Sequence, residues 1–143
     1  MDAAIDTARF GKISYVDADV IEVADGLPGF RTLRHFLLID NQDFSPIKFL
    51  QSIEDPIISF PLIDPKLVRP DYEFQLSGEE QADLELREPG EGLAYSIVTL
   101  GCSPDEASVN LFAPLVINAS KMRASQVILL GSEYSVSEPL LRG

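Results

Sequence analysis

The stretch Pro46–Pro65, with the sequence PIKFLQSIEDPIISFPLIDP, carries the clearest structural signal in the chain. Two short runs rich in β-branched and aromatic residues, Ile47–Ile53 and Ile57–Ile63, flank the turn formers Glu54-Asp55-Pro56. This pattern predicts two strands joined by a tight turn, with side chains alternating between two faces. Because a lone hairpin is marginal in water, further strands must pack over it.

Length and composition favour one globular domain. The chain has 143 residues, of which 45% are hydrophobic, and a chain of this size buries enough surface for a real core. It has no apolar run near the ~20 residues that span a membrane. The acidic start of the sequence is unlike a signal peptide, and the single cysteine, Cys102, permits no internal disulfide. We therefore expect a cytoplasmic protein, with residues 1–10 as a flexible extension.

The net charge restricts the classes of partner. It is −12, from 23 acidic against 11 basic residues. Binding to a phosphate backbone depends on lysine and arginine, so we expect no direct contact with nucleic acid. A protein of this charge is attracted instead to a basic partner.

Short apolar runs recur along the whole chain and predict an all-β fold. Asp71–Leu76 alternates most cleanly, with every second residue apolar. Ser77-Gly78-Glu79-Glu80 has the form of a helix capping box, which favours a short helix, although the residues up to Leu86 also alternate as a strand would. With at most one or two short helices, the pattern is typical of a small antiparallel β-barrel or sandwich. The other expected strands are Ile13–Val16, Val20–Val23, His35–Asp40, Leu93–Leu100, Val109–Asn118, Gln126–Leu130 and Tyr134–Val136.

The residue types argue against a familiar catalytic or metal site. One histidine and one cysteine exclude a zinc site built from these side chains. The sequence lacks EF-hand spacing, a Gly-x-Gly-x-x-Gly loop and a Gly-x-Ser-x-Gly elbow. A thiol–imidazole pair of Cys102 with His35 and a carboxylate-only active site remain open. We expect no cofactor, no metal and no enzymatic activity.

Three ordered motifs resemble one known family. They are Gly26-Leu27-Pro28-Gly29-Phe30, Leu50-Gln51-Ser52-Ile53-Glu54-Asp55-Pro56, and Val109–Asn118 followed by Gln126-Val127-Ile128-Leu129. In this order they resemble the bacterial flagellar assembly factor FliW family, from about Gly11 to Leu141. The chain departs from the family pattern at Ala24-Asp25, where an apolar or aromatic residue is common, and in its extension before Gly11.

The resemblance implies a single barrel-like domain over residues 11–141 that is monomeric and acts without catalysis. Family members bind flagellin in the cytoplasm. They also bind the translational repressor CsrA and antagonise it, so that flagellin synthesis follows flagellin secretion. Two alternatives stay open: a flagellin chaperone only, or a small carboxylate-dependent enzyme.

Seven polar residues are the candidates for partner contact. The central hairpin contributes a rigid acidic tip, and further acids follow it, while two asparagines flank a strand that Pro114 interrupts. Asparagine also readily satisfies backbone groups in loops and bulges, which is the alternative role for those two. The candidates are Gln51, Glu54, Asp55, Asp64, Asp71, Asn110 and Asn118.

Overall fold

The predicted hairpin is present and forms strands β5 (Lys48–Ser52) and β6 (Ser59–Ile63). They pair antiparallel with Leu50 opposite Phe60, in a computed structural model that describes residues 2–88 and 91–140. Leu62 is fully buried, and Phe60, two residues before it, packs against the same cluster, as the predicted alternation between two faces requires.

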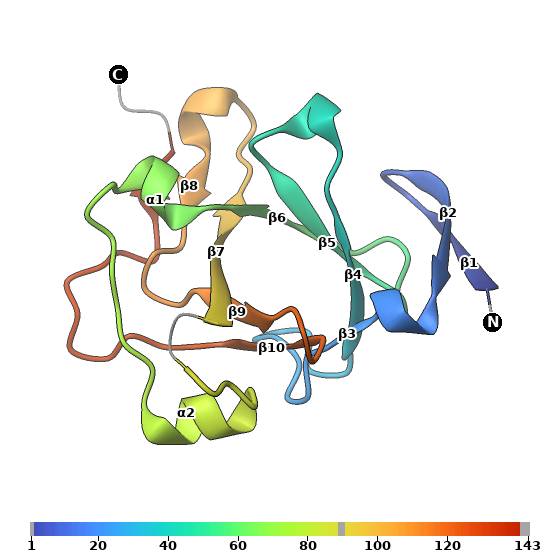
Figure 1. The fold of residues 1–143 in the computed structure, drawn as a ribbon. Coiled ribbons are helices and arrows are strands. Elements are labelled where there is room, and N and C mark those ends of the chain that lie inside the picture. The colour runs from blue at the N-terminus through green and yellow to red at the C-terminus, as the bar shows by residue number, and fades with distance from the viewer. Residues whose placement is uncertain (1, 89–90, 141–143) are drawn as a thin grey trace.

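Seven strands of the described chain close into a barrel (Figure 1). The hydrogen-bonded order is β7-β6-β5-β4-β3-β10-β9, and β9 closes the barrel by pairing with β7. The all-β prediction is confirmed, but the pairing is not wholly antiparallel, because β3 and β10 run parallel with Glu22 opposite Arg123. The other barrel strands are β3 (Ile21–Glu22), β4 (His35–Ile39), β7 (Gly92–Thr99), β9 (Leu115–Asn118) and β10 (Arg123–Gln126).

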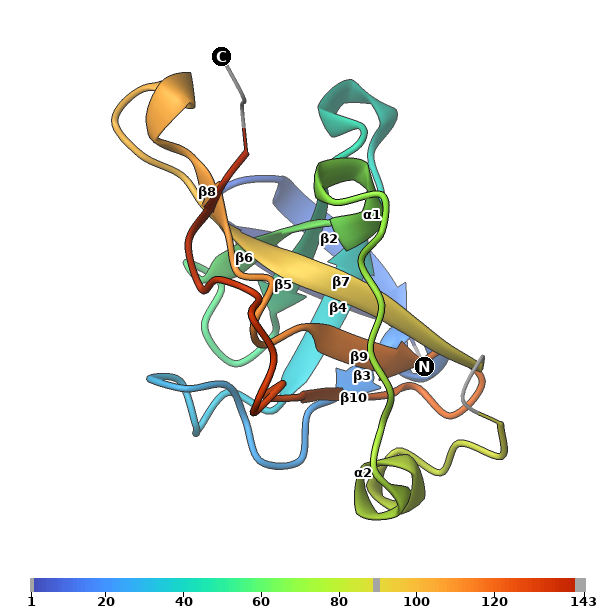
Figure 2. The ribbon, with the colours of Figure 1, turned by 90° about the vertical axis from the view of Figure 1, so that its left-hand side faces the viewer.

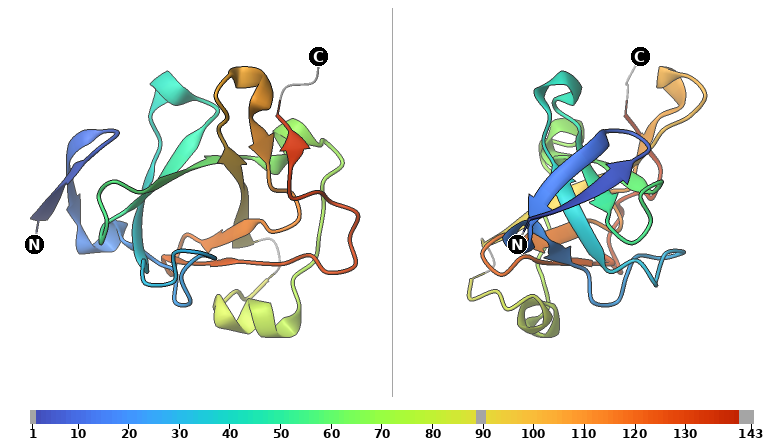
Figure 3. Two further views of the ribbon diagram at one scale, coloured as in Figure 1. Left: turned by 180° about the vertical axis from the view of Figure 1, so that it is seen from behind. Right: turned by 90° about the vertical axis from the view of Figure 1, so that its right-hand side faces the viewer.

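A separate hairpin lies beside the barrel and forms its own two-stranded sheet (Figure 3). Its strands are β1 (Asp2–Thr7) and β2 (Gly11–Val16), paired with Ile5 opposite Ile13. The small, polar composition of the first residues did not indicate this ladder. The mobility expected of residues 1–10 stays a prediction.

The helices are short and lie outside the barrel. They are α1 (Pro65–Val68) and α2 (Gly78–Asp83). The predicted capping box is confirmed: Ser77 Oγ accepts from the Glu80 N–H at 3.1 Å, and Glu80 Oε1 accepts from the Ser77 N–H at 2.8 Å. The described residues also contain 3₁₀ turns at η1 (Asp17–Asp19), η2 (Gln42–Phe44) and η4 (Pro104–Glu106).

Buried apolar side chains form two clusters, one on each side of β7. Tyr95 packs inside the barrel, whereas Val98 packs in a cluster on the outer face. The outer cluster is covered by Leu84 and Leu86, which follow α2, and by the segment between α1 and α2, which passes across β7 (Figure 2). This second core explains why so small a barrel carries long connections.

The segment Asp71–Leu76 is extended but is not a strand, which corrects the sequence prediction. Tyr72 is buried and Glu73 is exposed, so the predicted alternation of faces is present. The Glu73 N–H bonds to the Tyr134 hydroxyl rather than to a neighbouring strand. The alternating apolar residues of this segment therefore pack on the outer cluster, but the segment does not pair with a neighbouring strand.

The C-terminal strands also differ from their predicted bounds. Pro114 has no N–H to donate to a ladder, so the run Val109–Asn118 is divided into β8 (Ser108–Val109) and β9. The strand expected at Gln126–Leu130 lies earlier, as β10. The last strand is β11 (Glu138–Pro139), which pairs with β8, rather than Tyr134–Val136.

Candidate functional site

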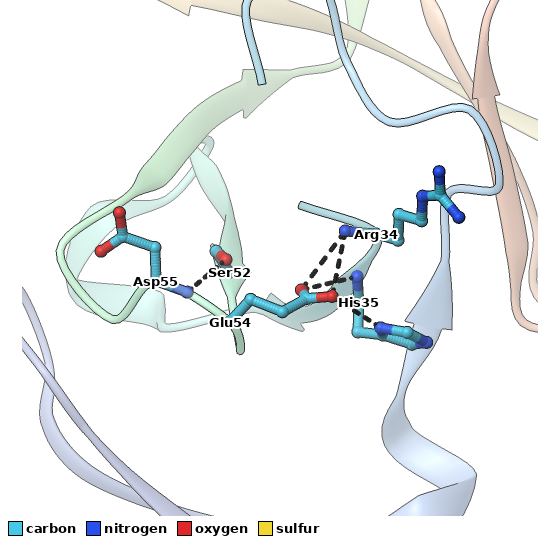
Figure 4. A network of polar contacts seen from close by, with 5 residues as sticks. All are labelled: Arg34, His35, Ser52, Glu54 and Asp55. Carbon is cyan, nitrogen blue, oxygen red and sulfur yellow. Dashed lines mark hydrogen bonds and ion pairs between the residues drawn. The ribbon is translucent and has the colours of Figure 1, made fainter. Parts of the chain in front are cut away.

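Glu54, at the tip of the central hairpin, is held by the start of β4 (Figure 4). Its carboxylate accepts hydrogen bonds from the His35 N–H at 2.9 Å, from His35 Nδ1 at 2.7 Å and from the Arg34 N–H at 3.2 Å. Burial alone would raise the pKa of Glu54, but together the hydrogen bonds from His35 and Arg34 lower it below its ordinary value. The negative charge is therefore fixed in position by the fold.

Asp55 points away from Glu54 and serves the turn itself (Figure 4). Its N–H donates to Ser52 Oγ at 3.0 Å, and its carboxylate accepts from the Ile57 N–H at 3.2 Å. Asp55 is half-buried, whereas Glu54 is exposed. The tip thus presents two carboxylates in different directions and does not form a facing acidic pair.

Gln51 is fully buried, so the surface position expected for it is wrong. Its Nε2 group contacts the carbonyl oxygens of Ser52, Pro56 and Ile58 at 3.0–3.1 Å. These carbonyls belong to the turn that connects β5 to β6, and a buried carbonyl needs a donor. Gln51 therefore holds the hairpin tip from inside the protein. Its part in partner binding stays a prediction.

The two asparagines also serve the backbone. Asn110 Oδ1 accepts from the N–H groups of Phe112 and Ala113 at 3.1 and 3.0 Å. Asn118 is 1% exposed, and its Nδ2 donates to the Leu84 carbonyl at 2.8 Å. The surface position expected for Asn118 is therefore wrong, because its amide joins β9 to the end of α2. Contact of either residue with a partner is untested.

The remaining candidate acids, Asp64 and Asp71, are both exposed. The Asp64 carboxylate caps α1 by accepting from the Lys66 N–H at 2.9 Å, and Asp71 forms an ion pair with Arg69 Nε at 3.3 Å. Asp64 follows the end of β6, whereas Glu54 and Asp55 precede its start. The candidate acids therefore lie before and after β6, and they do not form one acidic site.

A half-open groove of about 630 Å³ lies beside Asp64. Its sides are the start of α1, the extended segment Tyr72–Leu76 and the first half of β7, Gly92–Tyr95. We call this the β7 groove. Its lining combines apolar and polar surface in similar amounts, and includes the charged side chains of Asp64, Lys66 and Glu73. No candidate from the sequence other than Asp64 lines it.

Sequence reasoning missed two features of these surfaces. The ion pair of His35 with Glu54 joins residues 19 positions apart; predicting that β4 pairs with β5 would have placed them together, since Phe36 lies opposite Ser52. The β7 groove left no sequence signal beyond the alternation in Asp71–Leu76. Because the His35 ring is hydrogen-bonded to Glu54, the structure gives no support to a thiol–imidazole pair with Cys102.

The described residues also bear on metal and membrane sites. No group of three or more histidine, cysteine, aspartate or glutamate side chains in this part of the chain is placed to hold a metal ion. Within the same residues, neither helix has the length and apolar character needed to cross a membrane.

Known proteins resemble this chain over nearly its whole length. The family described as FliW protein matches residues 4–140. The flagellar assembly factor FliW of Caldanaerobacter subterraneus subsp. tengcongensis is 38% identical over 96% of this chain and 92% of its own length. That of Pseudothermotoga lettingae is 41% identical over 90% of this chain and 82% of its own.

The fold agrees with these similarities. A crystal structure of the flagellar assembly factor FliW superposes with a TM-score of 0.92 at 30% identity, and the match covers 99% of both chains. The three motifs of the sequence, the barrel and the similar proteins lead to one conclusion. The chain belongs to the flagellar assembly factor FliW family.

Proposed function

We propose that this protein is a cytoplasmic, monomeric flagellar assembly factor that binds flagellin and also binds and antagonises the translational repressor CsrA. Competition between the two partners would then couple flagellin synthesis to its secretion. The protein acts by binding and not by catalysis. The single observation that carries this proposal is the similarity to flagellar assembly factors over residues 4–140.

The charge of the molecule supports binding to a basic partner. The net charge is −12, and the fold fixes one of the acids, Glu54, against β4. Surface charge of one sign raises the association rate with an oppositely charged protein, and salt weakens this effect. An RNA-binding repressor is such a partner.

Titration of the purified protein against flagellin monomer and against CsrA, at low and at moderate salt, tests the proposal. We expect binding to both, with flagellin displacing CsrA and with CsrA affinity falling as salt rises. Binding to flagellin alone would reduce the role to that of a chaperone. Binding to neither would refute the proposal and direct attention to a carboxylate-dependent activity in the β7 groove.

Charge reversal at the hairpin tip maps the surface. We expect the double variant Glu54→Lys with Asp55→Lys to weaken binding to CsrA or flagellin. The matched control is Asp17→Lys with Asp25→Lys, which makes the same change in charge at exposed positions. Because Glu54 anchors β4, thermal unfolding of each variant must accompany the titration. Unchanged affinity for both partners in a folded tip variant would remove the tip from the interface.

A further inference from the structure

Strand β7 pairs with a neighbouring strand along only part of one of its two edges. Along one edge it pairs with β9 through Gly92–Tyr95 and with β8 at Val98 and Thr99. Along the other edge it pairs with β6 only at Ser96 and Ile97, because β6 ends there and the chain turns into α1. Of the residues that the structure describes, none forms a strand beside Gly92–Tyr95 on that edge.

This edge offers backbone groups that no strand of residues 2–88 or 91–140 pairs with. In a β-strand every second residue directs its N–H and C=O to the same edge, so at least one of the four residues Gly92–Tyr95 directs both groups to the open side. Unpaired groups of this kind are a template for a further strand. The opening lies in the β7 groove, so an added segment would find apolar side chains such as Phe74, Leu76 and Val116 as well as backbone partners.

The side chains of β7 show what such a segment would meet. Tyr95 and Ile97 pack inside the barrel and Val98 packs outside it. By alternation, Ala94 is directed outward, and it is partly exposed in the groove. A small side chain at this position leaves room for a larger apolar side chain from a partner.

We propose that the open edge of β7 at Gly92–Tyr95 binds an extended peptide segment of a partner protein by strand addition. The segment places alternate apolar side chains in the β7 groove and carries lysine or arginine toward Asp64 and Glu73. These two acids outnumber Lys66 among the charged residues that line the groove. This mode of binding takes its affinity from main-chain hydrogen bonds and its specificity from alternate side chains.

Charge favours another protein over a second copy of this chain. A second copy would bring the same net charge of −12 to an acidic rim. The first strand of the N-terminal hairpin, β1, contains the exposed Asp6 and would place an acid near Asp64 and Glu73. Like charges across adjacent strands are destabilising. The occupant is therefore a basic extended segment from a different protein.

This site is separate from the hairpin tip and its test is independent of flagellin and CsrA. Lys48 begins β5 and contacts Tyr95, with 3.4 Å between its Nζ and the hydroxyl, whereas Ser52 ends β5 at the tip. The two surfaces thus lie at opposite ends of β5. Failure of the titrations proposed above would leave strand addition standing, and the reverse also holds.

A random eight-residue peptide library displayed on phage provides the probe. Peptides are selected on the full-length protein and then compared on the variants Ala94→Arg, which fills the groove, and Ala18→Arg, which adds the same side chain at an exposed position of η1. Circular dichroism and thermal unfolding establish that both variants fold. We expect the selected peptides to carry alternating apolar residues with lysine or arginine, and to bind Ala18→Arg but not Ala94→Arg.

Backbone methylation of one selected peptide separates strand addition from contact through side chains alone. Replacing a peptide N–H by N–CH₃ at alternate positions removes main-chain donors, and we expect a loss of about 3- to 10-fold in affinity per methyl group that faces β7. Methylation at the intervening positions should have a smaller effect. Two results would overturn the proposal. One is that every selected peptide binds the Ala94→Arg variant as well as it binds the unaltered protein. The other is that a selected peptide keeps its affinity whichever backbone position is methylated.

Discussion

Replacing Asn118 by alanine should destabilise the fold. Its Nδ2 donates to the carbonyls of Leu84 and Glu85 at 2.8 and 3.3 Å. Its Oδ1 accepts from the N–H and hydroxyl groups of Ser120 and from the N–H of Lys121. The side chain thus joins the end of α2 to the turn between β9 and β10, and it is almost fully buried.

The size of the effect follows from these bonds. A hydrogen bond contributes about 1 kcal/mol net, and a buried group left without a partner costs about 1–3 kcal/mol. Alanine orphans the Leu84 carbonyl in the interior, while groups near the exposed Lys121 regain water. We expect Asn118→Ala to lower the free energy of unfolding by about 2–4 kcal/mol, which corresponds to a fall in Tm of roughly 10 °C for a domain of this size.

Asn118→Asp sharpens the experiment because it keeps the shape of the side chain. It replaces Nδ2 with an oxygen that faces two carbonyl oxygens, so we expect a loss at least as large as that for alanine. Asn41→Ala is the matched control, since Asn41 Oδ1 accepts from the Asp43 N–H at 2.9 Å at an exposed turn.

Urea unfolding gives the stabilities, and titration with flagellin and CsrA gives the affinities. A loss of less than about 0.5 kcal/mol for Asn118→Ala, together with weakened binding, would refute the structural role argued here. It would restore Asn118 as a contact residue.

Glu54→Gln should lower stability at pH 7 by about 1 kcal/mol after allowance for exposure. The lowered pKa of Glu54 means that its contribution is present above about pH 4.5 and is lost as pH falls through the folded-state pKa; a difference from wild type in urea unfolding that does not shrink as pH is lowered from 7 into the acid range would contradict this. Gln51→Ala should cost about 2–4 kcal/mol, with faster amide exchange in the β5–β6 turn. Gly26→Ala should cost several times more than Gly29→Ala in thermal unfolding, because both have positive φ but only at Gly26 would a Cβ lie 2.5 Å from the Arg31 Cα atom; equal losses would contradict it.

Features set by neighbouring residues could be predicted from the sequence. The β5–β6 hairpin and the Ser77 capping box depend on residues only a few positions apart, and both are confirmed. The alternation of Tyr72 and Glu73 between a buried and an exposed face was also predicted, and it is present. It could not report pairing, because an extended segment alternates whether or not a neighbouring strand is present.

Features set by distant residues could not be predicted in this way. The polar character of Gln51 and Asn118 suggested surface positions, yet both amides bond buried carbonyls. The Leu84 carbonyl is 34 residues from Asn118, and only the placement of α2 against β9 reveals the need for a donor. The same holds for Glu54, whose partners at Arg34 and His35 depend on the pairing of β4 with β5.

The division between amides and acids decides how binding experiments on this protein should be interpreted. Domains of this kind have a free energy of unfolding of about 5–15 kcal/mol, so a loss of about 2–4 kcal/mol leaves most molecules folded. Substitution of Gln51 or Asn118 would then reduce affinity through local rearrangement of the hairpin tip or of the α2 end, and not through global unfolding. For Asp64, which is exposed, we expect a change to act on a partner through charge, provided that thermal unfolding shows its cap on α1 to be dispensable. Salt dependence separates the two cases, because screening affects the interactions of exposed charges far more than those of buried amides.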